Sequence, residues 1–295
     1  MIKLFWNTEN QKVPDPNKKD SKEIADYSWG FYHKKNSDKW IFHILKKIHF
    51  KLIKNHNELE SGDILIIVDS SVENKEELYT KLKLICSRMF LIHLGDETGI
   101  NDLNNIYSNF NFVWRTFCSG QFFKNDKVNC FPLGYKSGVS FRKQENNRKY
   151  KWAFIGTPHR SSRHDILFQF SEIQPSFCHK TSKFNQNIID VEKMSAVLSS
   201  TEFIPCPNGF FHPETYRVYE ALECDCIPIV ENAFNYYDRL LPENPFIKVD
   251  KWIDAKNIVK EWDEKKIRQK REECKLWWFN YKNKLQENIF KRINS

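Results

Sequence analysis

The stretch from Phe203 to Glu231 combines charged side chains with a turn-rich loop and two apolar runs. It predicts a strand, a loop, a helix and a second strand, in that order. Arg217 and Glu220 are three residues apart, so both project from one face of the predicted helix. A guanidinium binds phosphate and a carboxylate binds sugar hydroxyls, so the pair suits a nucleotide-sugar.

The loop before this helix is suited to binding an anion. Gly209 lets the backbone approach a ligand closely. Pro213 suits the first helical turn, where its missing N–H costs nothing, and Arg217 would then lie about one turn into the helix. The N–H groups of a helix start have no partner within the helix, so they attract phosphate. Glu220 has apolar neighbours, which favours a partnered, buried carboxylate over a solvated surface charge.

A second candidate for phosphate binding follows the apolar segment 152–156. Gly156 and Thr157 form a small-residue turn, after which come two serines and the guanidiniums of Arg160 and Arg163. The turn is not a P-loop, because the Gly-Lys-Ser/Thr ending is missing. The alternative is a helix start with exposed arginines. With Arg217 in the same half of the chain, we expect both segments to lie at strand carboxyl ends and face one crevice.

Three acids each follow an apolar segment in the first half of the chain: Asp69, Asp96 and Glu97. A carboxylate at the end of a parallel strand could remove the proton from an acceptor hydroxyl. The alternative for each is a cap on the following helix. On position alone, Asp69 and Glu97 rank ahead of Asp96. His33 and His93 are weaker candidates, since an isolated histidine is more often a hydrogen-bonded structural residue.

Two α/β halves are expected to position these groups. In the first half, the predicted strands are 2–6, 63–69, 89–94, 110–117 and 128–133, and the predicted helices are 40–52 and 73–86. A polar linker at 134–149 leads to a second half, with strands at 152–156 and 246–249, helices at 165–170, 188–199 and 251–293, and the 203–231 stretch. The halves imply a cleft between them, where ligands commonly bind. The expected domains are residues 1–138, residues 139–270, and a C-terminal helix at 271–295 that could pack back on the first domain.

Composition limits the classes of protein that fit. The chain has 295 residues, 40% of them hydrophobic, and a net charge of +8 that is spread along its length. Such a diffuse surplus indicates solvated helix faces more than a nucleic-acid track. The eight cysteines include no C-x-x-C pair, and we expect reduced, buried thiols in a cytoplasmic, soluble protein. Neither a signal peptide nor a membrane-spanning segment is expected.

The segment Phe203–Glu231, with its Tyr-Arg-x-Tyr-Glu-Ala and Ile-Pro-Ile-Val-Glu runs, resembles the nucleotide-binding half of exostosin-type glycosyltransferases. It is most similar to the ribitol xylosyltransferase branch. The motifs Phe154-Ile155-Gly156-Thr157, Leu94-Gly95-Asp96-Glu97 and Pro132-Leu133-Gly134-Tyr135 add to the resemblance, which covers roughly residues 90–250. Soluble enzymes of this kind occur in bacteria and large algal viruses, which would place a viral member in the host cytoplasm. Asp225 departs from the family, which often has Gly there.

The resemblance implies a GT-B fold, with two Rossmann-like domains facing a central cleft, and an inverting displacement at the anomeric carbon. It implies a UDP-sugar donor, UDP-xylose first, a glycan hydroxyl as acceptor, and no obligatory metal. Arg217, with Arg163 in support, would neutralise the diphosphate, and Glu220 would bind the ribose hydroxyls. The expected donor-binding residues are Gly156, Thr157, Arg160, Arg163, Asn208, Gly209, Thr215, Tyr216, Arg217 and Glu220. No motif identifies the base.

Two alternatives stay open. Within the same enzyme class, the donor could be another UDP-sugar carrying galactose, glucuronic acid or glucose. Outside it, the basic surface could belong to a non-catalytic protein that binds glycans or polyanions.

Overall fold

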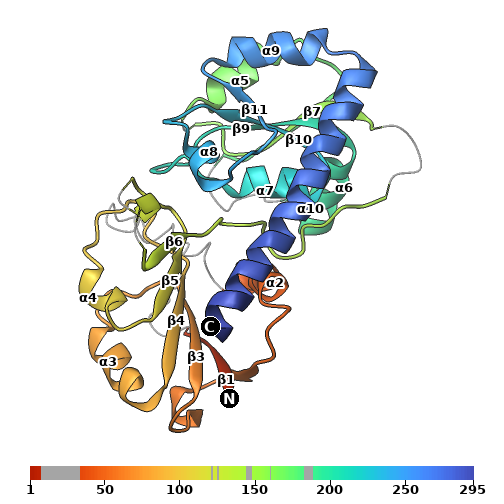
Figure 1. The fold of residues 1–295 in the computed structure, drawn as a ribbon. Helices are drawn as coiled ribbons and strands as arrows, with labels where there is room; N and C mark the ends of the chain where they lie inside the picture. Colours follow the sequence, from red (N-terminus) through yellow and green to blue (C-terminus); the bar gives the residue numbers. More distant parts are fainter. Residues whose placement is uncertain (8–33, 121, 125, 144–147, 160, 183–188) are drawn as a thin grey trace. The chain divides into compact units, whose positions relative to one another are not determined.

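Two parallel sheets organise the chain (Figure 1). The computed structural model describes residues 1–7, 34–120, 122–124, 126–143, 148–159, 161–182 and 189–295. The chain divides into unit 1, Met1–Leu133 with Gln286–Ser295, and unit 2, Gly134–Leu285. Each unit has its own sheet, as the alternation of apolar runs and helical segments predicts.

The sheet of unit 1 has the strand order β2-β1-β3-β4-β5-β6, with every pair parallel. Its strands are β1 (Ile2–Trp6), β2 (Lys51–Ile53), β3 (Ile64–Asp69), β4 (Arg88–His93), β5 (Phe112–Arg115) and β6 (Val128–Cys130). The helical segments are α2 (Lys34–Ile44), η2 (His56–Glu58), α3 (Glu76–Ile85), α4 (Asn104–Tyr107) and η3 (Phe122–Lys124). The central strands β3 and β4 are buried along nearly their whole length, because helices cover both faces of a parallel sheet.

The sheet of unit 2 has the order β11-β10-β9-β7-β8, again with parallel pairs. Its strands are β7 (Tyr150–Gly156), β8 (Ser176–Lys180), β9 (Thr201–Cys206), β10 (Ile227–Glu231) and β11 (Ile247–Val249). The helices are α5 (Arg163–Gln169), α6 (Val191–Ser199), α7 (Tyr216–Glu223), α8 (Tyr236–Leu240), α9 (Trp252–Glu261) and α10 (Glu264–Asn294). Figure 1 shows α5 and α9 on one face of this sheet and α6 and α7 on the other.

Helix α10 contributes to both units. Its residues from Gln286 onward belong to unit 1, where Gln286 Nε2 donates to the carbonyl of His43 at 3.0 Å. Ile289 and Ile293 are fully buried there, and the guanidinium of Arg292 lies 4.3 Å from the centre of the Phe112 ring. The end of the chain thus completes the core of the unit in which the chain begins.

Most predicted strands are confirmed, but some boundaries are wrong. The helix expected over 40–52 ends at Ile44, and Lys51–Ile53 pairs with β1 as an edge strand instead. Strand β8 and helix α8 were not predicted. Helix α7 begins at Tyr216, so Pro213 lies before the helix and not in its first turn. The reason is that Thr215 is still extended, with φ −140° and ψ 152°. Arg217 is consequently the second residue of α7.

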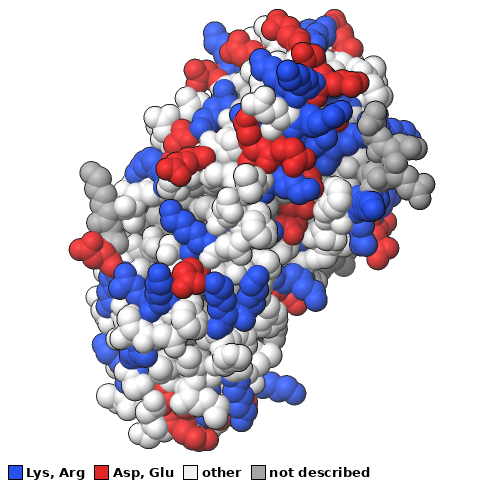
Figure 2. Space-filling view, turned by 45° about the vertical axis from the view of Figure 1, so that its right-hand side comes forward, with Lys and Arg blue, Asp and Glu red and all other residues white. Residues whose placement is uncertain are grey.

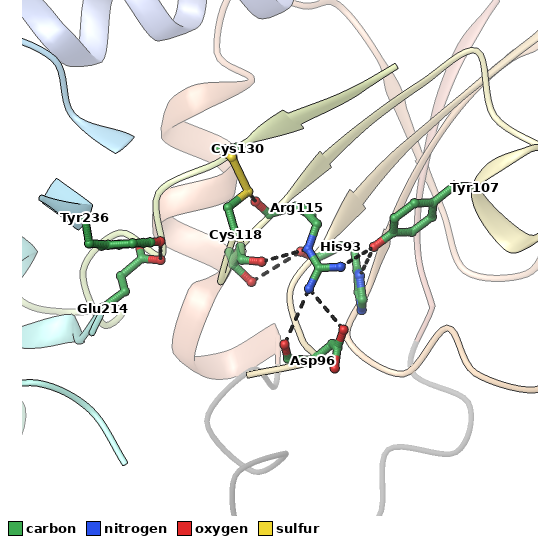
Figure 3. Close-up of a disulfide and its surroundings, with 9 residues drawn as sticks. His93, Asp96, Tyr107, Arg115, Cys118, Cys130, Glu214 and Tyr236 are labelled. Atoms are coloured by element: carbon green, nitrogen blue, oxygen red, sulfur yellow. Dashed lines mark hydrogen bonds and ion pairs between the residues drawn. A yellow bond between two sulfur atoms is a disulfide. The ribbon is translucent and has the colours of Figure 1, made fainter. Parts of the chain in front are cut away.

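The expectation of reduced thiols is wrong for two cysteines. Cys118 and Cys130, which flank η3 in unit 1, form a disulfide (Figure 3). Four other cysteines are free and buried as expected, whereas Cys178 is free and exposed. Among the described residues, no helix combines the length and apolarity needed to cross a membrane.

Candidate functional site

The strand end at Gly156 and the helix start at Arg217 are in direct contact. Strands β7 and β9 are parallel neighbours, so the loops that follow them leave the same edge of the sheet. Arg217 Nη2 donates to the carbonyl of Ile155 at 3.1 Å, and its guanidinium lies 5.6 Å from the centre of the Phe154 ring. Gly156 has φ +137°, and a Cβ there would lie 2.6 Å from Arg217 Nη2. The two predicted phosphate-binding segments therefore meet.

Arg217 is half-buried and Glu220 is buried, and no direct ion pair joins the opposite charges of these two described residues. Glu220 is 9% exposed, and burial raises its pKa, with the positive charges of Arg217 and Lys136 acting in the opposite direction. Burial likewise lowers the pKa of Arg217, and the carboxylate of Glu220 partly offsets this. No described residue donates a hydrogen bond to the Glu220 carboxylate. A buried carboxylate is costly without a donor, so this one is available to a ligand's hydroxyls.

Three buried polar atoms around this contact have no hydrogen-bond partner among the described residues. They are Ser162 Oγ, Asn208 Oδ1 and Arg217 Nε. They come from the residue before α5, from the loop after β9 and from α7, respectively. Buried polar atoms in folded proteins nearly always have partners, so a cluster of exceptions indicates groups that a ligand would satisfy.

The loops that carry these atoms are held together by hydrogen bonds. Ser161 Oγ donates to the carbonyl of Asn208 at 3.2 Å, and this joins the 157–163 turn to the loop after β9. The N–H of Asn208 donates to Glu231 Oε2 at 2.8 Å, at the end of β10. Within the turn, Arg163 Nη1 donates to the carbonyl of Thr157 at 3.0 Å. The predicted residues Thr157, Arg163 and Asn208 thus form one connected edge.

The remaining predicted donor residues lie along the same edge. Gly209 is partly exposed, and Thr215 and Tyr216 are the cap and the first residue of α7. The side chain of Thr215 makes no capping hydrogen bond to the start of the helix. Arg160 lies outside the described residues, as does His33.

Glu214 supports this edge and was not predicted. Its carboxylate is buried and accepts hydrogen bonds from the hydroxyls of Tyr219 and Tyr236, the latter at 2.9 Å (Figure 3). Because Tyr219 belongs to α7 and Tyr236 to α8, Glu214 ties the two helix starts together. The acidic residue between Pro213 and Thr215 was visible in the sequence, but its two partners depend on the tertiary fold.

In unit 1, Asp69 is fully buried and its oxygens are all engaged. They accept hydrogen bonds from Lys75 Nζ at 2.8 Å, from Tyr79 Oη at 2.7 Å and from the N–H of Ser71 at 2.8 Å. Burial raises the pKa of Asp69, and Lys75 acts in the opposite direction. This environment stabilises the β3–α3 connection.

Asp96 is also buried and belongs to a chain of four polar side chains (Figure 3). Arg115 Nη2 pairs with Asp96 Oδ2 at 3.1 Å, while Arg115 Nη1 donates to Tyr107 Oη at 3.2 Å. Tyr107 Oη lies 2.7 Å from Nδ1 of His93. Burial, together with the charges of Arg115 and Lys75, holds the pKa of His93 well below its usual range. Of the three predicted acids, only Glu97 is partly exposed.

Among the described residues, no group of three or more His, Cys, Asp or Glu side chains is arranged to hold a metal ion. Positive charge at the edge of unit 2 is supplied by guanidiniums.

Solved structures define the class to which this fold belongs. The chain is similar to an α1,3-fucosyltransferase, with a TM-score of 0.55 and 11% identity over 99% of this chain and 90% of the other. It is also similar to Anabaena Alr3699/HepE in complex with UDP and glucose, with a TM-score of 0.53 and 9% identity over 100% and 99% of the two chains. Two parallel α/β units of this kind are the GT-B fold of glycosyltransferases, as predicted.

The sequence then identifies the family. The family model described as the RXYLT1 C-terminal domain matches residues 131–295, more than half of the chain. The chain therefore belongs to this family, and the match includes all of the predicted donor-binding residues. No curated protein is similar enough in sequence to match the chain.

Proposed function

We propose that this protein transfers a sugar, with inversion, from a UDP-sugar to a hydroxyl of a glycan. The observation that carries the proposal is the contact between Gly156 and Arg217, beside a buried Glu220 that no described residue hydrogen-bonds. A diphosphate and a ribose would supply the missing partners. The GT-B fold and the family match support a sugar transferase.

Arg217 would neutralise the diphosphate as it leaves. Its Nε is buried without a partner among the described residues, and its Nη2 is held by the carbonyl of Ile155, so the guanidinium is oriented before the ligand arrives. A preorganised cation stabilises developing negative charge without reorganising during the reaction. Arg163, fixed through Thr157, would add a second positive charge, and Asn208 and Gly209 would approach the diphosphate or the sugar.

Glu220 would accept hydrogen bonds from the two ribose hydroxyls. A carboxylate offers two oxygens with several acceptor sites, which matches a vicinal diol. Such bonds stabilise the ionised form and would oppose the rise in pKa that burial causes in the free protein.

The base that deprotonates the acceptor is proposed to come from the carboxyl edge of the unit 1 sheet. Asp69 and Asp96 have their oxygens engaged by Lys75 and Arg115, so they suit a structural role. Glu97 is the predicted acid that is partly exposed.

The donor sugar is proposed to be xylose, since the 203–231 segment resembles the ribitol xylosyltransferase branch. Glucose is the main rival because the Alr3699/HepE structure contains UDP and glucose, and galactose and glucuronic acid follow. Measuring UDP release with a panel of UDP-sugars and glycan acceptors tests the proposal. Failure of every UDP-sugar to react, together with no UDP binding by calorimetry, would refute it.

A non-catalytic polyanion-binding protein is the second candidate, favoured by the net charge of +8. Figure 2 shows acidic and basic side chains mixed over much of the face that it presents. Tight, salt-sensitive oligonucleotide binding without turnover of any UDP-sugar would support this second candidate.

A further inference from the structure

Glu73 is a further acid at the carboxyl edge of the unit 1 sheet. It lies in the loop between β3 and α3 and is partly buried. Asn101 Nδ2, from the loop after β4, donates to Glu73 Oε1 at 2.9 Å. The carboxylate is therefore held in a defined orientation on a residue that is only partly buried.

Glu73 differs from Asp69 and Asp96 in having no cationic partner among the residues that the structure describes. Asp69 is paired with Lys75 at 2.8 Å and Asp96 with Arg115 at 3.1 Å, and both pairs are buried. In the described part of the chain, Glu73 forms no ion pair. Asp69 and Asp96 are thus held by buried cations, whereas Glu73 is oriented by the neutral amide of Asn101 and by its own backbone N–H.

The electrostatic surroundings favour proton uptake at Glu73. Burial raises its pKa, and the nearby carboxylates of Asp96 and Asp69 raise it further. Its own backbone N–H and the amide of Asn101 act in the opposite direction but do not cancel the rise. A general base works best when its pKa approaches the working pH, so the direction of this shift suits the task.

His93, at the end of β4, lies fully buried beneath the same edge. Tyr107 Oη accepts a hydrogen bond from Arg115 at 3.2 Å and lies 2.7 Å from His93 Nδ1. When Tyr107 donates to Nδ1, His93 Nε2 carries the ring proton, and this buried atom has no hydrogen-bond partner among the described residues. A Cβ on Gly95 would lie 3.2 Å from this Nε2 and 2.5 Å from the carbonyl oxygen of Ser70, so the chain packs closely around the buried ring.

We propose that Glu73 is the general base that accepts the proton of the acceptor hydroxyl. The inference rests on the proposed transferase function and assigns its base. The hydroxyl oxygen forms the new bond to the anomeric carbon, and the bond from that carbon to the β-phosphate oxygen breaks. Its electron pair leaves with UDP, and the hydroxyl proton passes to the Glu73 carboxylate. Asn101 positions the carboxylate, and Asp69 and Asp96 stay paired with their cations.

The test compares Glu73→Gln with Glu97→Gln and with Glu77→Gln, a control on the exposed face of α3. Glu73→Gln should lower kcat by about 10²–10⁴-fold, leave UDP affinity unchanged and remove the acidic limb of the kcat/KM pH profile. Glu77→Gln should match the wild type. Asn101→Ala should move the acidic limb to higher pH, because the ionised carboxylate loses a donor.

The outcomes separate this inference from the proposed function. Full activity in Glu73→Gln, or loss of the acidic limb in Glu97→Gln instead, would overturn the role of Glu73 while leaving the transferase intact. Wild-type protein that binds no UDP and transfers no sugar would overturn both. A Glu73→Gln protein that has lost its UDP affinity as well would indicate a structural role and also count against the base.

Discussion

Arg217 Nη2 lies where a side chain on Gly156 would have to be, 2.6 Å from an ideal Cβ position. The last residue of β7 thus leaves the space that the side chain of a residue of α7 occupies. Two features favour glycine at position 156: its φ of +137°, which other residues rarely adopt, and the guanidinium that fills the place of a Cβ.

Gly156→Ala should weaken UDP binding at least tenfold, because the new methyl group displaces the guanidinium of Arg217. Backbone strain would add a destabilisation of about 1–3 kcal/mol. Gly62→Ala is the matched control, since Gly62 also has a positive φ, +86°, but a Cβ there meets nothing within 4 Å. Calorimetry with UDP and urea unfolding separate the two effects. Equal UDP affinity in both variants would contradict a ligand role for the Gly156 contact.

Arg217→Ala should abolish donor binding while the fold survives. Truncating one partner of a buried, hydrogen-bonded charge pair costs about 2–5 kcal/mol, which corresponds to a loss of roughly thirtyfold or more in UDP affinity. Arg268→Ala, on the exposed surface of α10, removes the same charge from unit 2 and should leave the affinity unchanged. If both variants bind UDP like the wild type, Arg217 does not contact the diphosphate.

UDP affinity should fall as the pH is lowered through the raised pKa of Glu220, because ribose hydroxyls donate to the ionised carboxylate. Glu220→Gln should flatten this pH dependence and weaken binding. The stability of the ligand-free protein should change with pH in the opposite direction. Because the pKa of Glu220 is raised in the folded state, the free energy of unfolding falls as the pH rises. Glu220→Gln should therefore stabilise the ligand-free protein near neutral pH. Calorimetric titrations over a pH series and thermal unfolding measure both. A pH-independent wild-type affinity would argue against the ribose contact.

Asp96→Asn should destabilise unit 1 by about 3–5 kcal/mol, since it leaves the buried guanidinium of Arg115 without its counter-charge. Glu77→Gln breaks an exposed ion pair with Lys81 and should cost at most about 1 kcal/mol. Chemical unfolding followed by tryptophan fluorescence gives both values. Similar small losses in the two variants would show that Arg115 finds another partner.

The central strands of the unit 1 sheet could be predicted, because continuous apolar runs such as Ile64–Val68 suit a strand buried on both faces. The sequence also led us to expect the segments that carry Gly156 and Arg217 at one edge of the sheet, since the loops after parallel strands leave one edge, but their direct contact depends on the tertiary fold. The pairing of Asp69 with Lys75 and Tyr79 could not be predicted, because it depends on how α3 packs against β3. The Cys118–Cys130 disulfide has no local signature, since the two cysteines are 12 positions apart in the sequence.

The last turns of α10 fill the core of unit 1 with Ile289 and Ile293. During synthesis, the first 133 residues leave the ribosome long before these side chains exist. The core of unit 1 therefore stays incomplete, with an uncovered apolar face, until unit 2 has been synthesised and the end of α10 has formed. The order in which the two units are completed is the reverse of the order in which they are begun.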